Sequence, residues 1–358
     1  MRRRGLLGLA LAPLAACDGP EPLPPAWAGP PARLRDPVLR ALAWGRLAPS
    51  ACNAQPWQVA LAAPDRLILR ADPARALPVL DPDGRQARIA LGAFVELAVM
   101  AAAAEGRRCE VTPLPDGAVA LRLTAASGPP SDPLFAALPR RRTTRLAYDL
   151  IEPVKPGQAA ALRAAAGTAV RFGCVVEPER VAPLRELARQ AHELAQAIPE
   201  VARENAAWLR LDDAAEDGIP VRGAPVRWAR ALGLLSAGQL ADPTSLAFRM
   251  ARLQWANLFA ATASFGWIAT LADGAEDRLA AGRAYQRVDL AAAAQGLAIH
   301  PVSEALGNVP ALGGARGELE RLLGAPGRVQ MLFRLGRAGP QPPTPRRPVE
   351  AFTVVTVE

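Results

Sequence analysis

A long, mostly apolar segment from Arg85 to Glu105, followed directly by Gly106, constrains the fold of this chain most strongly. A glycine at that place is typical of a helix end, because the residue after the last turn often adopts a left-handed conformation. The segment therefore predicts one long helix. Ala275–Gln295 predicts a second helix of similar length in the other half of the sequence.

The rest of the chain alternates between strand and helix patterns without a strict strand–helix–strand repeat. Gln58–Ala63 and Arg66–Arg70 predict two strands joined by a Pro-Asp turn. Thr244–Ala272 is apolar and rich in aromatic residues, and it predicts one long helix or a helix pair. Helices that flank a sheet in this order predict an α+β fold. Further strands are predicted at 110–113, 118–123, 170–176, 328–335 and 349–357, and further helices at 36–47, 156–166, 179–197 and 200–211.

The first 17 residues resemble an export signal. Arg2–Arg4 precede a short apolar stretch, 5–16, which falls short of the roughly 20 residues that a spanning helix needs. Leu14-Ala15-Ala16-Cys17 resembles a bacterial lipobox, and the arginines resemble a twin-arginine signal. We expect a lipoprotein anchored through Cys17 on the periplasmic side of the inner membrane, with the Pro-rich residues 18–33 as a tether. A cytoplasmic protein with a mis-assigned start is the alternative.

Charge and cysteine content exclude several classes of function. The formal net charge is +8, but the arginines are spread along the chain and lie near acids at helical spacing, so we expect no nucleic-acid partner. Three cysteines besides Cys17, no Cys-x-x-Cys pair and two histidines leave little material for a disulfide framework, a metal site or a Ser-His-Asp triad. The phosphate-binding patterns of Rossmann and P-loop proteins are also absent from the sequence.

The segment Pro49–Trp57 places Ser50, Asn53 and Gln55 directly after a helix end and before a strand. Small polar side chains at such a place can offer hydroxyl, amide and backbone groups to a ligand. On the residues alone, a capped loop that leads into an edge strand is an equally good interpretation.

Two arginine-rich segments are candidates for binding a phosphate. Arg140–Arg145 holds four arginines and two threonines, which can bind a phosphate through charge-assisted hydrogen bonds. Thr344–Pro348 holds a second arginine pair between prolines. A solvated charge run and a basic tail are the alternative interpretations.

Together these segments resemble the nitroreductase family of flavoenzymes. Pro49–Trp57 matches the family element Pro-Ser-x-x-Asn-x-Gln-Pro-Trp, and Arg141–Arg145 matches its Arg-x-Ser/Thr-x-Arg/Lys phosphate element. Gly296–Val302 resembles the turn that lies on the flavin ring, and Arg346-Arg347 resembles a C-terminal basic pair. The resemblance covers most of the chain after about residue 35, and it implies the FMN-dependent nitroreductase fold with FMN as the cofactor.

The order of these elements departs from the usual family pattern, in which both lie close together on a short chain that forms a homodimer. Here the Asn-x-Gln-Pro-Trp element lies in residues 34–127 and the arginine element opens residues 134–358. The resemblance therefore implies two fused halves that form a pseudo-dimer, similar to the Acg-type branch. A monomer with one FMN per chain is expected.

The resemblance assigns residues to cofactor binding and none to catalysis, since the flavin carries the hydride chemistry. Glu304 stands where the family often has glycine. The assigned residues are Arg141, Arg142, Thr143, Arg145, Arg346 and Arg347 at the phosphate, Ser50, Asn53 and Gln55 at the polar edge of the flavin, and the backbone of Pro301, Val302, Ser303 and Glu304 at the central ring.

The resemblance implies an oxidoreductase that passes two electrons to a nitroaromatic or quinone-like acceptor. The electron donor is NAD(P)H or, for an exported protein, a donor on the membrane side. A flavin-sequestering protein with little turnover and a lipoprotein with an empty site are the alternatives. If the chain is an oxidoreductase, Phe265 or Trp267 of the aromatic segment is a candidate to stack against the substrate. A position in the core is the more common role for such residues.

Overall fold

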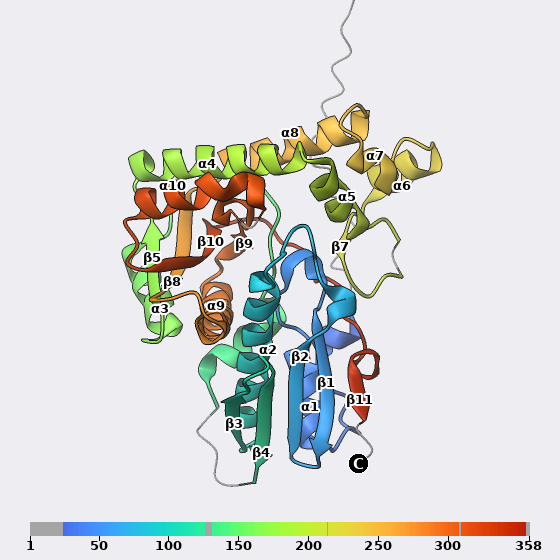
Figure 1. Ribbon diagram of the computed structural model, residues 1–358, viewed down its shortest axis with the longest axis vertical. Coiled ribbons are helices and arrows are strands. Elements are labelled where there is room, and N and C mark those ends of the chain that lie inside the picture. The colour runs from blue at the N-terminus through green and yellow to red at the C-terminus, as the bar shows by residue number, and fades with distance from the viewer. Residues whose placement is uncertain (1–23, 126–130, 213, 308, 356–358) are drawn as a thin grey trace, which may run out of the picture.

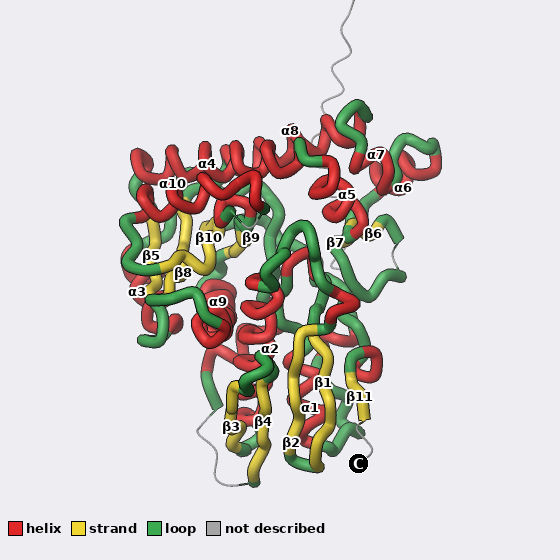
Figure 2. The backbone as a smooth tube through the Cα atoms, viewed as in Figure 1, coloured by secondary structure: helices red, strands yellow, loops and turns green. Residues whose placement is uncertain are grey.

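The computed structural model describes residues 24–125, 131–212, 214–307 and 309–355 (Figure 1). The described residues form two main sheets built mostly from antiparallel strands, each with its own helices, and one short parallel pair of strands, so the α+β prediction is confirmed. Figure 2 shows the strands in two groups, with the long helices α2 (Arg85–Ala104) and α9 (Ala275–Ala294) between them. Both helices agree with the sequence-based prediction to within one residue.

The first half forms a sheet with the strand order β11-β1-β2-β4-β3. Neighbouring strands are antiparallel, except that the C-terminal strand β11 pairs parallel with β1. Asp36 caps the first helix by accepting the amides of Val38 and Leu39, as its position before Pro37 predicts. The elements are α1 (Pro37–Gly45), β1 (Trp57–Ala63), β2 (Arg66–Ala71), α2, β3 (Arg108–Pro113), β4 (Val119–Thr124) and β11 (Thr353–Val355).

The second half repeats this plan. Its sheet has the order β5-β8-β10-β9, and all neighbours are antiparallel. In both halves a helix precedes the first strand, and a 20-residue helix follows the second strand, so the predicted two-half architecture is confirmed. The elements are α3 (Pro156–Ala166), β5 (Arg171–Val175), β8 (Ser264–Thr270), α9, β9 (Ala298–Pro301) and β10 (Arg328–Gly336).

The two halves meet where α2 crosses α9. Gly92 and Gly282 are each the eighth residue of their helix, and their Cα atoms face one another at the crossing. A Cβ atom at Gly282 would lie 1.9 Å from the carbonyl oxygen of Ile89, and one at Gly92 would lie 2.2 Å from that of Leu279. The close approach of the two backbones therefore requires glycine on both helices.

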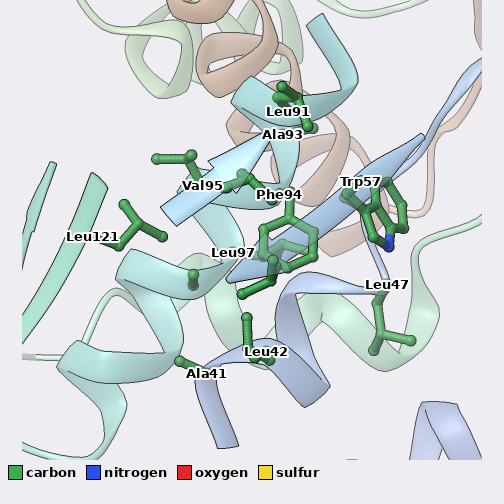
Figure 3. Packing of buried hydrophobic residues seen from close by; sticks show 14 of the residues in the cluster. Ala41, Leu42, Leu47, Trp57, Leu91, Ala93, Phe94, Val95, Leu97 and Leu121 are labelled. Atoms are coloured by element: carbon green, nitrogen blue, oxygen red, sulfur yellow. The ribbon is translucent and has the colours of Figure 1, made fainter. Parts of the chain in front are cut away.

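The core of the first half surrounds Phe94 of α2 (Figure 3). Its ring lies 5.3 Å from that of Trp57 on β1 and 6.3 Å from that of Phe352, which precedes β11. Phe352 is buried, so the C-terminal segment is part of the first half's core. The α2 helix is apolar and long enough to cross a membrane by composition, but 78% of its apolar window is buried inside the protein.

A helical layer is inserted between β5 and β8 and covers one end of the molecule. Figure 1 shows α4, α6, α7 and α8 together at that end, away from the sheet of the first half. A further helix, α10 (Gly313–Leu323), lies below them. The inserted elements are α4 (Pro178–Gln196), α5 (Pro199–Ala207), β6 (Leu209–Arg210), β7 (Ile219–Pro220), α6 (Ala224–Ala231), α7 (Ala237–Ala241) and α8 (Leu246–Ala260).

The single helix or helix pair predicted over Thr244–Ala272 is wrong in its second part. Helix α8 ends at Ala260, and Ser264–Thr270 forms the strand β8. This strand lies between β5 and β10 and is buried on both faces, so its side chains show no alternation between apolar and polar. A short apolar run of this kind cannot be told from a buried helix by periodicity.

The chain before residue 34 also differs from the prediction of a tether, as far as the structure describes it. Residues 25–28 form a 3-10 helix, and the Trp27 side chain is buried in the core of the first half. Its indole Nε1 donates to the carbonyl oxygen of Thr344 at 2.8 Å. Pro-rich composition indicated a stiff spacer, but one aromatic side chain with a matching partner fixes this segment to the domain. The export signal and Cys17 lie outside the described residues.

Candidate functional site

One cavity brings together three of the four segments that the sequence singled out, namely Pro49–Trp57, Arg140–Arg145 and the turn at Gly296–Val302. Its walls come from the loop after α1, from the segment before α3, from the turn after β9, and from α2, α8 and α9. Both halves and the inserted helical layer therefore contribute to one site. The predicted site residues that line it are Ser50, Thr143, Arg145, Pro301, Val302, Ser303 and Glu304.

The loop after α1 forms one lip of the cavity under backbone strain. Cys52, Asn53 and Gln55 have φ angles of 51°, 51° and 53°, and no other described residue besides glycine has a positive φ. Residues other than glycine rarely adopt a positive φ, because the Cβ atom crowds the backbone. Such strain persists only where the surrounding structure holds the backbone in place. Ser50 Oγ accepts the amide of Gln55 at 3.0 Å. Burial raises the pKa of the cavity-lining Cys52 thiol to about 12, so it does not act as a thiolate nucleophile at neutral pH.

The C-terminal arginine pair braces this lip from behind rather than lining the cavity. Arg346 Nη1 donates to Asn53 Oδ1 at 2.8 Å, and Asn53 Nδ2 donates to the carbonyl of Pro345 at 3.2 Å. The amide of Arg347 donates to Gln55 Oε1 at 2.9 Å. These bonds hold the residues of positive φ in place. They also consume the polar groups of Asn53 and Gln55 that the sequence assigned to the ligand.

Arg141 and Arg142 also have protein partners and do not line the cavity. Arg141 is 1% exposed and pairs with the buried Asp289 of α9 at 2.9 Å. The guanidinium carbons of Arg141, Arg142 and Arg346 lie 5.3, 4.7 and 5.2 Å from the ring centroid of Trp27. A carboxylate and an aromatic face therefore compensate the positive charges that the sequence assigned to a phosphate.

Arg145 is the member of the arginine segment that lines the cavity. The structure gives its guanidinium no hydrogen bond or ion pair to any described residue; only its backbone amide donates, to Gln341 Oε1 at 3.2 Å. Burial lowers the pKa of Arg145, against the opposing influence of Cys52 and Tyr285, yet an arginine remains charged at neutral pH. A half-buried cation without a protein partner is suited to an anionic ligand.

The segment that carries Arg145 lies against the predicted ring turn. Thr143 forms an isolated parallel bridge with Ile299 of β9, and the amide of Thr144 donates to the carbonyl of Ile299 at 2.9 Å. In the turn itself, the amide of Val302 donates to the carbonyl of Leu332 at 2.8 Å. Backbone pairing thus sets the distance between the phosphate element and the turn.

Two histidines and a tryptophan form the wall next to α8. The ring centroid of Trp255, on α8, lies 4.7 Å from that of His192 and 5.4 Å from that of His300. His192 Nδ1 lies 3.1 Å from Glu304 Oε1. Burial works to raise the pKa of Glu304, but the hydrogen bond and charge of His192, with the charge of Arg145, hold it below its ordinary value. Burial, with the nearby charges of Arg145 and Arg334, lowers the pKa of His300 well below its ordinary value, so this imidazole is neutral at neutral pH.

Three buried polar atoms on the cavity walls have no hydrogen-bond partner in the described part of the chain. They are Tyr285 Oη, Gln330 Oε1 and His192 Nε2. An unpartnered buried polar group costs about 1–3 kcal/mol. Their gathering in one cavity, beside Arg145, indicates that a polar ligand occupies it.

Comparison with known proteins agrees with this site. Two curated proteins of Mycobacterium tuberculosis are each 35% identical to the chain over 320 residues, which are 84% of this chain and 86% of theirs: "Putative NAD(P)H nitroreductase Rv3131" of strain H37Rv and "Putative NAD(P)H nitroreductase MT3217" of strain CDC 1551 / Oshkosh. The chain belongs to the nitroreductase family. No family model matches it.

Solved nitroreductases show a more remote likeness. The FMN-dependent nitroreductase NfnB from Mycobacterium smegmatis in complex with NADPH is 18% identical, with a TM-score of 0.38, over 63% of this chain and 100% of that chain. Iodotyrosine deiodinase bound to FMN and 3-iodo-L-tyrosine is 14% identical, with a TM-score of 0.34, over 60% of this chain and 94% of the deiodinase chain. At these scores the likeness is too remote to carry a conclusion about this chain.

For this member of the nitroreductase family, the sequence-predicted site residues fall into two sets. Seven line the cavity. The other six, which the sequence placed at the ligand, lie outside the cavity lining and bind protein groups instead: Asn53, Gln55, Arg141, Arg142, Arg346 and Arg347. The described residues hold no cluster of three or more metal-ligating side chains.

Several cavity residues of this nitroreductase were missed. His192 is 3% exposed, and no local pattern in the sequence distinguishes it. Tyr285 and Gln330 lie within the predicted helix at 275–295 and the predicted strand at 328–335, where no pattern marks them as functional. From the predicted aromatic segment, the residues that line the cavity are Phe248, Trp255 and Phe259 of α8. Phe265 and Trp267 lie on β8, outside the cavity lining.

Proposed function

We propose that the chain is an FMN-dependent oxidoreductase that holds one FMN in the cavity and passes two electrons to a nitroaromatic or quinone-like acceptor. Membership of the nitroreductase family supports the reaction class. The observation that carries the site is the guanidinium of Arg145, which has no partner among the described residues, in a cavity lined by three of the four motif segments. NAD(P)H, for which the curated relatives are named, is the proposed donor.

The residues present fit FMN. Arg145 supplies a cation for the phosphate, and the Thr143 hydroxyl lies on the same segment. Tyr285 Oη, Gln330 Oε1 and His192 Nε2 offer buried polar atoms that lack a hydrogen-bond partner among the described residues. The rest of the lining is largely apolar and suits an aromatic ring system; it includes Leu77, Ile89, Ala93, Phe248 and Leu332.

When bound, the flavin supplies the hydride chemistry, and the protein supplies orientation and electrostatics. In the turn after β9, Pro301 has no N–H and Val302 uses its own on Leu332. The amides of Ser303 and Glu304 are therefore the proposed donors toward the flavin ring. The lip residues keep their strained backbone through Arg346, so Ser50 and Cys52 reach the cavity at fixed positions.

A flavin-sequestering protein remains the second candidate, and one observation favours it. The loop between α5 and α6 is fastened to the lip. Gln55 Nε2 donates to the carbonyl of Glu216 at 2.9 Å, and Asn53 and Gly218 exchange two hydrogen bonds, of 2.9 and 3.2 Å. Asp217 pairs with both Arg75 and Arg210. A loop held in this way can restrict access of an acceptor to the cavity.

Turnover separates the two candidates. We expect the FMN-loaded protein, reduced anaerobically by NADPH, to be reoxidised by nitrofurazone in repeated cycles, because α8 leaves an aromatic wall for a planar acceptor. Stopped-flow absorbance near 450 nm measures both half-reactions. Asp217→Asn is the matched variant, since it loosens the fastened loop without touching the cavity lining. Reoxidation that is slow in the native protein and fast in this variant would instead support sequestration.

We also propose export as a lipoprotein and membership of the Acg-type branch. The two-half topology on one chain supports the branch. The export proposal depends on the sequence pattern that ends at Cys17, since residues 1–23 lie outside the described part of the chain. The mass of the amino-terminal peptide from membrane-extracted protein shows whether Cys17 carries lipid; an unprocessed peptide that begins at Met1 would contradict export.

A further inference from the structure

The outer surface of α6 and α8, together with the segment between them, exposes apolar side chains to an unusual degree. We call residues 222–253 the α6–α8 face. Of the eleven large hydrophobic side chains that are exposed in the described part of the chain, six lie on this face, and Trp228 and Leu232 are 70% and 69% exposed. A gathering of exposed large apolar side chains within one short stretch of chain indicates an interaction site. The other four are Leu234, Leu246, Met250 and Leu253.

The same face is positively charged. Besides Arg222, and besides Arg252, which also lines the cavity, it carries Arg227, Arg230 and Arg249 against a single acidic residue, Asp242. Asp242 accepts hydrogen bonds from the amide and hydroxyl of Thr244. The acid that reaches the face from the neighbouring α4 is Glu193, which lies 3.8 Å from Arg252 and is shared with Arg189. The face therefore keeps an excess of positive charge next to its apolar side chains.

Helix α8 separates this face from the cavity. Phe248, Trp255 and Phe259 line the cavity, whereas Leu246, Met250 and Leu253 are exposed on the opposite side of the helix. Residues three, four and seven positions apart share one face of a helix, which explains this division. Because one side of α8 already has its packing partners, the apolar outer side is left for an external partner.

The position of the face permits contact with an extended surface. Figure 1 shows α6, α7 and α8 along one end of the molecule, and Figure 2 shows that end as a layer of helices and loops without long strands. A planar partner can therefore meet several of these helices at once. The sheet of the first half lies toward the opposite end and does not obstruct the approach.

We propose that the α6–α8 face docks onto the anionic surface of a lipid bilayer. A helix that exposes Trp and Leu beside Arg is typical of segments that lie in the plane of the membrane interface. The arginines complement anionic headgroups, which attract juxtamembrane basic residues. A second copy of the chain fits less well, because two such faces would oppose like charges.

Vesicle binding tests the proposal on the full chain carrying Cys17→Ser, which prevents lipid attachment. We expect sedimentation with vesicles of phosphatidylcholine and phosphatidylglycerol (70:30) and weak binding to phosphatidylcholine alone. Arg227→Gln with Arg230→Gln should weaken the partition roughly tenfold or more, and so should Trp228→Ser with Leu232→Ser. The matched control is Ile151→Ser, at an apolar residue that is 89% exposed on another surface and should leave the partition unchanged.

A local readout removes the contribution of the amino-terminal apolar stretch. Brominated lipids quench tryptophans that enter the interface, and we expect quenching in the native chain that disappears in Trp228→Phe while binding persists. Thermal melts verify that the exposed substitutions leave the fold intact. The proposal is overturned if both double variants bind the anionic vesicles as strongly as the native chain does, or if the brominated lipids do not quench Trp228. Self-association in sedimentation velocity that the same variants abolish, without vesicle binding, would identify a second copy as the partner and would also overturn it.

Discussion

Arg145→Gln is expected to weaken FMN binding by roughly 10- to 100-fold, the effect of losing a charge-assisted contact with a phosphate. Arg145 is the cavity-lining arginine of its segment, and its guanidinium has no partner among the described residues. The substitution therefore removes no internal hydrogen bond. Titration of the apoprotein with FMN, followed by quenching of flavin fluorescence, measures the change in Kd.

Two further measurements separate a binding role from a structural one. Arg142→Gln is the matched control, because Arg142 belongs to the same segment but donates to the carbonyls of Pro139 and Arg141 outside the cavity. It should leave the Kd for FMN within about twofold. The apoprotein of Arg145→Gln should be as stable as the native apoprotein or more stable, since a partly desolvated charge is removed. Equal loss of FMN in both variants would contradict the assignment to Arg145.

Gly282→Ala is expected to destabilise the protein by about 3 kcal/mol or more, at the upper end of overpacking effects. The added methyl group would lie 1.9 Å from the carbonyl oxygen of Ile89 and 3.0 Å from the Cα atom of Gly92. Both contacts are with backbone atoms of α2, so no side chain can rotate away. The helices must separate, and the free energy of unfolding from urea titration measures the cost.

The matched control for this prediction is Gly317→Ala on α10. A Cβ atom there meets no other atom within 4 Å, and the residue lies inside a helix. Alanine should raise the free energy of unfolding by about 0.5–1 kcal/mol, because glycine loses more backbone entropy on folding. The crossing of α2 and α9 joins the half that carries Ser50 to the half that carries Arg145. A folded Gly282→Ala protein with native stability would show that the halves do not meet at this crossing.

The sequence predicted the parts of the site whose signal is local. The lip and the arginine segment each contain several polar residues in a short stretch, and both contribute to the cavity. What the sequence could not predict is which arginine lines the cavity. Arg141 and Arg145 look alike in the sequence, but Arg141 pairs with Asp289, which is 148 residues away along the chain. The burial of His192 beside Glu304 and the packing of Trp27 against three arginines depend on equally distant partners.

The fold was predictable to a similar degree. Helices α2, α3 and α9 carry clear apolar patterns and end signals, and the structure confirms them closely. Strand β8 was predicted as helix because it is buried on both faces. The predicted strand at 349–357 exists as the shorter β11, but no sequence pattern indicates that it pairs with β1 of the first half. That pairing depends on the buried Phe352, whose aromatic partner Phe94 lies far away in the sequence.

The flavin content of protein purified without added FMN tests the central claim most directly. The account predicts a yellow protein that releases one FMN per chain on denaturation, because both halves contribute to a single cavity. Quantitative absorbance of the released flavin against the protein concentration gives the ratio. Colourless protein that also fails to take up added FMN would contradict the account, and so would a ratio of two, which requires a second complete site.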